Sequence, residues 1–126
     1  MEKMEPKVIL LLIVLALFIS CSTSNQEEQR LLDDAYAKQT EAIELIVELE
    51  ENLKTSTNPQ KDSLLEVIEE LEESLIAIPG YTLNLPGHEG HDHGHAKVEQ
   101  SAEEIYKVQE EILKQLNQIQ KTIRNQ

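Results

Sequence analysis

The sequence is poor in cysteine, aromatic residues and glycine, and each shortage excludes a class of protein. Cys21 is the only cysteine, so the chain forms no intramolecular disulfide and no zinc site built from several cysteines. It has no tryptophan and a single phenylalanine, Phe18. The core is therefore expected to be aliphatic, without a deep aromatic-lined ligand pocket. All four glycines lie in residues 80–94, and no phosphate-binding loop or nucleophile motif occurs, so we expect no enzymatic activity.

Basic residues are also scarce. Eleven Lys and Arg stand against 24 Asp and Glu, which gives a formal net charge of −13. This excludes a nucleic acid partner, because binding phosphates requires a basic surface. It also disfavours electrostatic adhesion to anionic lipid headgroups. The surplus of carboxylates is compatible with cations or basic proteins as partners, although its simplest role is to keep a small domain soluble.

One apolar run, residues 8–19, stands near the N-terminus and reads VILLLIVLALFI. It is too short to span a bilayer, which takes about 20 apolar residues, but it suits the apolar region of a signal peptide. Lys3 and Lys7 precede it, and the polar residues 22–30 follow Cys21. A lone cysteine directly after such a run indicates a site of lipid attachment.

The segment resembles a bacterial lipoprotein signal peptide, with Phe18–Cys21 in the position of the lipobox, although the family prefers Leu where Phe18 stands. The resemblance implies a signal peptide over residues 1–20, cleavage before Cys21, lipidation of its thiol and acylation of its new amino group. Two or more acyl chains would hold the chain firmly to a bilayer, at about 0.8 kcal/mol per buried methylene. The alternatives are an uncleaved anchor and a buried N-terminal helix.

The residues after Cys21 indicate to which membrane, and to which face of it, the protein would be delivered. By the sorting rule of enterobacterial lipoproteins, Ser22 in place of Asp implies delivery to the outer membrane. Glu27 and Glu28 resemble the acidic tracts that other bacteria use for surface export, so the periplasmic and the external face both stay open. Residues 21–26 are expected to form a polar tether between lipid and fold.

Three segments with apolar residues at three- and four-residue spacing predict an all-α fold. The first helix is predicted over residues 27–54, opened by a capping box at Ser24 and Glu27 or at Asn25 and Glu28. Its seam comprises Leu32, Ala35, Gln39, Ala42, Ile46, Leu49 and Leu53. The second is predicted over residues 59–78, with Asn58 as N-cap, Pro59 as first helical residue and Pro79-Gly80 as stop. Its seam comprises Leu64, Ile68, Leu71, Leu75 and Ile78.

A linker, residues 79–97, separates the second helix from a third, predicted over residues 98–124. Ser101 and Glu104 match a capping box that would start this helix later. The linker begins by alternating apolar and polar residues, with Tyr81, Leu83 and Leu85 expected to face inward. The seam of the third helix comprises Val98, Ala102, Ile105, Gln109, Ile112, Leu116, Ile119 and Ile123.

These elements predict an antiparallel hairpin with a third long helix, in a three-helix, coiled-coil-like bundle. An open hairpin whose third helix serves in oligomer formation is the alternative, and self-association is plausible for so small a core. The outward faces are expected to be acidic, with Glu44, Glu48 and Glu51 on the first helix and Glu66, Glu69, Glu70, Glu72 and Glu73 on the second.

Residues 87–95, GHEGHDHGH, are the one stretch whose composition suggests a specific chemistry, the binding of a metal ion. Its six candidate metal ligands are His88, Glu89, His91, Asp92, His93 and His95. Imidazoles suit Zn²⁺, Cu²⁺ and Ni²⁺, and the stretch resembles the His-rich loops of metal transporters and metallochaperones. We expect an exposed, exchangeable site that weakens below about pH 6.5, as the imidazoles protonate. The plainer interpretation is a solvated spacer.

The whole layout is similar to a group of small uncharacterised lipoproteins common in Bacteroidota, some labelled "viral A-type inclusion protein". The resemblance covers Phe18–Cys21, Asp33–Leu53, Leu64–Ile78 and Ile105–Ile123, and it implies no activity. Two hypotheses follow. The first is an envelope binding or adaptor protein whose His-rich loop samples transition metal. The second is a structural lipoprotein that pairs with another envelope protein, the loop being an incidental spacer.

Overall fold

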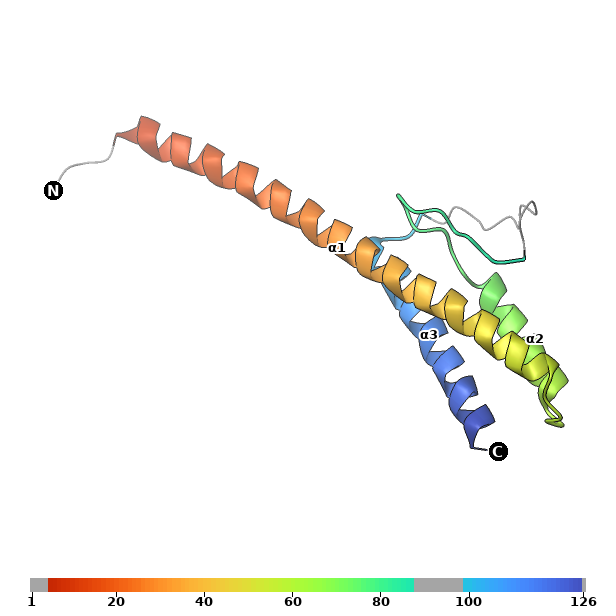
Figure 1. Cartoon of the computed structure of the whole chain (residues 1–126). Helices are drawn as coiled ribbons and strands as arrows, with labels where there is room; N and C mark the ends of the chain where they lie inside the picture. Colours follow the sequence, from red (N-terminus) through yellow and green to blue (C-terminus); the bar gives the residue numbers. More distant parts are fainter. Residues whose placement is uncertain (1–4, 88–98, 126) are drawn as a thin grey trace.

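The fold is all-α, as the sequence predicts. The computed structural model describes residues 5–87 and 99–125, without the side chains of residues 10–12 and 14–22. Over these ranges it contains no strand and three helices, α1 (Pro6–Lys54), α2 (Lys61–Glu73) and α3 (Ala102–Arg124). The C-terminal part of α1 packs against both other helices, and its N-terminal part extends away from them (Figure 1). The result is a bundle-like fold on one long helix.

The start of α1 differs from the prediction. The helix begins at Pro6 rather than near residue 27, and it continues through the proposed signal peptide and the tether. Pro6 suits a first helical turn because its fixed φ is helical and its missing N–H needs no partner there. No other proline and no glycine interrupts the chain before Lys54. The two candidate capping boxes are not used, because a helix that has already begun needs no N-cap. The predicted end at residue 54 is confirmed.

Helix α2 is shorter than predicted at both ends. Asn58 is not its N-cap: the side-chain Oδ1 accepts from the Gln60 N–H at 2.8 Å, which forms a turn, and Gln60 precedes the first helical residue. At the other end the helix stops at Glu73, where the Ser74 hydroxyl donates to the Glu70 carbonyl at 2.7 Å. Pro79-Gly80 therefore does not end a helix.

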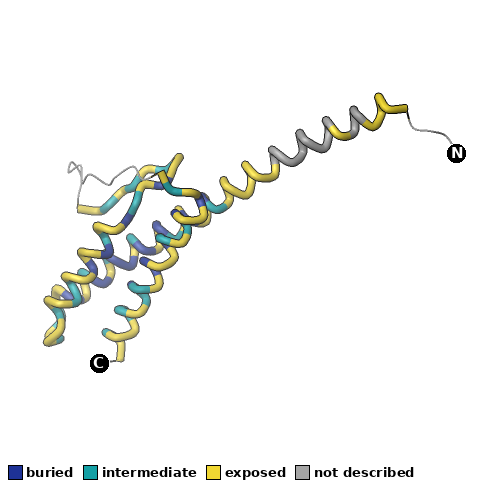
Figure 2. Tube along the Cα trace, turned by 180° about the vertical axis from the view of Figure 1, so that it is seen from behind, coloured by how far each residue is buried: buried dark blue, intermediate teal, exposed yellow. Residues whose placement is uncertain are grey.

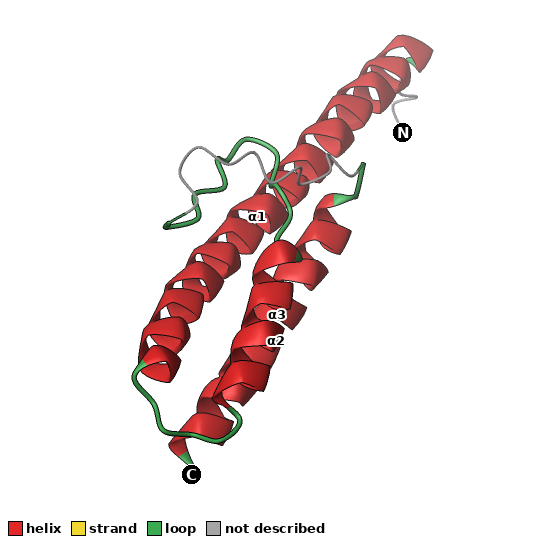
Figure 3. Cartoon of the chain, turned by 90° about the vertical axis from the view of Figure 1, so that its right-hand side faces the viewer, coloured by secondary structure: helices red, strands yellow, loops and turns green. Residues whose placement is uncertain are grey.

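The dipeptide Pro79-Gly80 instead forms a turn in the linker. The Tyr81 N–H donates to the Ile78 carbonyl at 3.0 Å, and Gly80 has φ +86°. Proline then glycine with positive φ is the pattern of a type II turn, in which a side chain at the glycine position would be strained. The chain beyond runs back over the bundle as an extended loop (Figure 3). There Tyr81, Leu83 and Leu85 are partly buried and alternate with exposed residues, as predicted.

Helix α3 begins at the capping box. Ser101 is the N-cap, with its hydroxyl accepting from the Glu104 N–H and the Glu104 carboxylate accepting from the Ser101 N–H. The predicted start near residue 98 is three to four residues early, since helical hydrogen bonding begins only where this reciprocal cap satisfies the first free N–H groups. Val98, assigned to the seam of this helix, lies outside the described residues.

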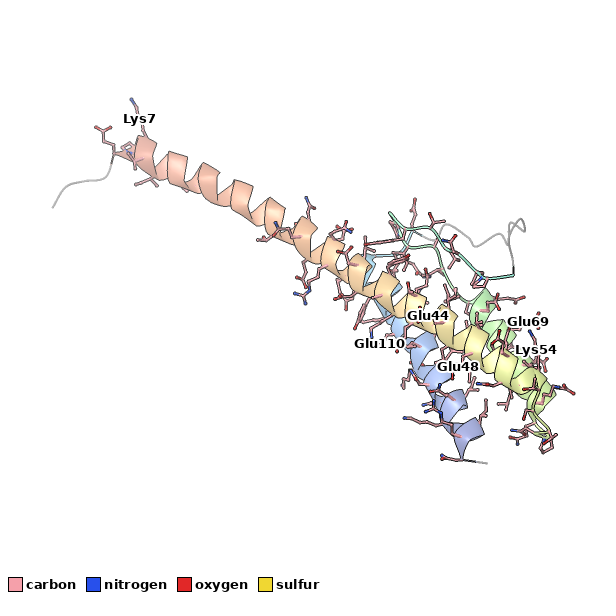
Figure 4. All side chains as sticks on the ribbon, viewed as in Figure 1. Lys7, Glu44, Glu48, Lys54, Glu69 and Glu110 are labelled. Carbon is pink, nitrogen blue, oxygen red and sulfur yellow. The ribbon has the colours of Figure 1, made fainter. Side chains whose placement is uncertain are left out.

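The predicted seams form the core (Figure 2). All seven seam residues of α1 are buried, and so are four of the five assigned to the second helix, Leu64 being half-buried. In α3 the seam is buried from Ala102 to Leu116 and half-buried at Ile119 and Ile123. The carboxylates predicted to face outward are exposed, except Glu72, which is half-buried. Glu44 and Glu48 of α1 and Glu69 of α2 are labelled in Figure 4.

Candidate functional site

The N-terminal part of α1 is the first candidate for a functional role. Val8, Ile9 and Ile13, the side chains of the apolar run that the structure describes, are about half exposed. Residues 23–30 are helical and exposed on all sides, so they form a stalk between the apolar run and the bundle, which begins with half-buried Leu31. Cys21 lies in α1 just before this stalk. No described helix is long and apolar enough to cross a membrane.

Where the stalk meets the bundle, an aromatic contact fixes the linker to α1. The rings of Tyr36 and Tyr81 stack with centroids 4.1 Å apart and an interplanar angle of 14°. The Tyr81 hydroxyl donates to the Asp33 carboxylate, which also accepts from Gln29 Nε2 at 2.8 Å. The hydrogen bond from Tyr81 lowers the pKa of Asp33 and raises that of Tyr81, because it favours the ionised carboxyl and the protonated phenol.

This contact involves residues that sequence reasoning did not bring together. The alternating pattern predicts that Tyr81 faces inward, but it does not point to Asp33, which lies 48 positions earlier on an exposed face of α1. The sequence feature that points toward this contact is the turn-forming Pro79-Gly80, which sends the chain back toward α1. The third tyrosine, Tyr106, lies at the same end of the bundle, with Lys38 Nζ 5.3 Å from its ring centroid. The contact positions the start of the linker.

A groove between α2 and α3 is the second candidate. Its apolar lining consists of Val67 and Leu71 of α2 with Val108 and Ile112 of α3, and it has a volume of about 370 Å³. Glu70 and Glu111 also line it. Leu71 and Ile112 are in the predicted seams, but Val67 is not, and its 39% exposure marks an apolar side chain that the bundle leaves uncovered.

The proposed metal ligands all belong to the His-rich stretch. His88, Glu89, His91, Asp92, His93 and His95 all lie outside the described residues. Within residues 5–87 and 99–125, no three His, Cys, Asp or Glu side chains gather in a way that would hold a metal ion. The metal site therefore stays a prediction from the sequence.

The acidic side chains on the helices are a solvated surface. Those that make ion pairs do so mostly within one helix, as Lys107 does with Glu103 at 2.6 Å and Lys54 with Glu50 at 3.6 Å. Exposed pairs of this kind contribute little to stability. Comparison with known proteins finds no family model that matches the sequence, no similar curated protein and no similar solved structure.

Proposed function

We propose that the protein is a lipid-anchored adaptor of the bacterial cell envelope, in the outer membrane, which binds another envelope protein through its helices and catalyses no reaction. The observation that carries this proposal is the continuity of α1. Leu32, the first buried seam residue, lies eleven positions after Cys21, so an unbroken helix would hold the bundle about 16 Å from the anchor. Such a stalk presents a binding surface at a defined height.

The finer architecture that we propose is a three-helix bundle whose first two helices form an antiparallel hairpin with coiled-coil-like packing. Figure 3 supports it: α2 runs back along α1, and α3 runs in the direction of α1. The exposed apolar side chains at the start of α1 support the signal peptide that this anchor requires, because they take no part in the packed core. The chain's shortage of basic residues leaves acylation as the main source of membrane affinity.

The anchor is tested at Cys21. In a bacterial host that processes lipoproteins, the wild-type chain is expected to begin at Cys21 and to carry acyl chains, as seen in its intact mass. Cys21→Ser should remove both modifications, because the hydroxyl does not replace the thiol in lipid transfer, while the neighbouring Ser22→Ala should leave them unchanged. An unmodified wild-type chain that still begins at Met1 would contradict the proposal and favour an uncleaved anchor.

The His-rich stretch supports a second candidate function, the binding of Zn²⁺, Cu²⁺ or Ni²⁺. Its support is the spacing of six possible ligands within residues 88–95. In calorimetry of the full chain in non-ionic detergent, we expect saturable one-to-one binding that is lost when His88, His91, His93 and His95 are all replaced by Asn. Binding should weaken as the pH falls below about 6.5. Equal binding by the two proteins would leave the stretch as a spacer.

A further inference from the structure

The packing of α2 against α3 is incomplete. Helix α2 has 13 residues and α3 has 23, and after Glu73 the chain leaves the helical path. Helix α1 packs extensively against α3, whereas α2 meets α3 over a much shorter stretch. The face of α2 that looks toward α3 is therefore only partly covered, and the groove described above lies along this seam.

The lining of the groove is apolar, and it is accessible at the opening. Val67 and Leu71 are one turn apart on α2, and Val108 and Ile112 are one turn apart on α3. Leu71 and Ile112 are only 8% and 4% exposed and close the base, while Val67 is 39% exposed at the opening. Two turns of helix span about 11 Å, so the groove has room for two apolar side chains spaced three or four residues apart on a docked helix.

The rim of the groove is negatively charged. Glu70 lines it from α2 and Glu111 from α3, and Glu66 and Glu73 are exposed one turn to either side of Glu70. Lys114 offsets part of this charge, since its Nζ lies 3.6 Å from the Glu111 carboxylate. Among the described residues, Glu66, Glu70 and Glu73 have no ion-pair partner. These three carboxylates are thus available to cations from outside.

We propose that this groove docks a basic amphipathic helix of a partner protein, with its apolar side chains on Val67 and Leu71 and its Lys or Arg side chains on Glu66 and Glu70. The inference rests on the proposed adaptor function and names the chemistry of the partner. Charge decides against a second copy as the occupant. In a symmetric dimer, the acidic rim of one copy would face the same rim of the other. Each chain has a net charge of −13, so the repulsion between these like charges disfavours the dimer.

The proposal is tested with a synthetic helical peptide of Leu and Lys, about 18 residues or five turns long, and the full chain in non-ionic detergent. Calorimetry is expected to show saturable one-to-one binding that weakens as salt is added. Val67→Lys should raise the Kd at least about tenfold, because it places a like charge and a longer side chain at the opening. Ala37→Lys, which adds the same charge at an exposed position of α1, is the matched control.

Each of four other outcomes would overturn the proposal. Equal weakening by Val67→Lys and Ala37→Lys would show general attraction to an acidic protein rather than docking in the groove. Equal binding of a Leu and Glu peptide of the same pattern would show that the rim does not select a basic partner. Concentration-dependent self-association of the chain that Val67→Lys abolishes would assign the groove to a second copy, and no binding of the Leu and Lys peptide would leave it without an occupant.

A second measurement separates failure of the groove from failure of the adaptor function. A photo-crosslinking amino acid is placed at position 67, and in other variants at exposed positions 37 and 40 of α1, in the native membrane. Crosslinks to protein from position 67 are expected. Crosslinks only from α1 would overturn docking in the groove but would agree with the adaptor function. No crosslink from any position would overturn both proposals.

Discussion

Replacing Leu49 by alanine is expected to lower the free energy of unfolding by about 2–5 kcal/mol. Leu49 is 1% exposed and lies in the main core cluster, among residues from all three helices. The substitution removes buried methyl groups and leaves a cavity that packed helices only partly close. Leucine and alanine are both good helix formers, so the loss reports burial rather than helix propensity.

The measurement is urea unfolding of the full chain in non-ionic detergent, followed by circular dichroism and tyrosine fluorescence. Tyrosine emission is observable because the chain has no tryptophan, and Tyr36 and Tyr81 stack only when the linker lies on α1. Val67→Ala is the control: its side chain is 39% exposed, and its effect should stay within about 0.5 kcal/mol. Similar effects of the two substitutions would contradict a packed core around Leu49.

The core could be predicted from the sequence because burial follows a single period. Three- and four-residue spacing placed Leu32, Leu49 and Leu116 correctly, and only one side of a helix can face its neighbours. The same spacing misled at the end of α2. Leu75 and Ile78 continue its rhythm and are buried, but the chain there is no longer helical. The chain leaves the helix in a turn in which the Leu75 N–H donates to the Glu72 carbonyl, and it then buries both residues along an irregular path. Apolar spacing cannot distinguish such a path from a continued helix.

The start of α1 was missed for a different reason. Capping residues show where a helix can begin, but Ser24 and Asn25 have no such role in a helix that already runs from Pro6. The candidate functional features were less predictable still. The groove depends on how far α2 extends beside α3, and the contact of Tyr81 with Asp33 depends on the path of the linker. Both are tertiary properties: the groove leaves no local pattern in the sequence, and Pro79-Gly80 marks the turn before Tyr81 but not the partner of that tyrosine.

The contact between two glutamines in the core was also not predicted from the sequence. Gln39 and Gln109 each belong to a predicted seam, and the structure brings them together at 1% and 0% exposure. Gln39 Nε2 donates to the Ile76 carbonyl at 2.8 Å and, at a longer 3.4 Å, to Gln109 Oε1. Gln109 Nε2 is buried with no hydrogen-bond partner among the described residues. The two amides therefore have opposite energetic roles, although they touch each other.

Gln109→Met is expected to raise the free energy of unfolding by about 1–2 kcal/mol, because it removes a buried donor that lacks an acceptor. It gives up only the long bond from Gln39, which keeps its bond to the Ile76 carbonyl. Gln39→Met should lower the free energy of unfolding by about 1–3 kcal/mol, since the Ile76 carbonyl and Gln109 Oε1 both lose their donor. Methionine matches glutamine in length and in helix propensity, so both substitutions keep the shape of the core.

Urea unfolding of the two single variants and the double variant closes a thermodynamic cycle for the contact. In the double variant the amides of both residues are gone, so its stability should lie between those of the single variants. Loss of stability in both single variants, by similar amounts, would mean that Gln109 Nε2 has an acceptor in solution. Opposite signs from two residues in contact would instead show that Gln39 holds the segment after α2 against α1, while Gln109 is tolerated at a cost.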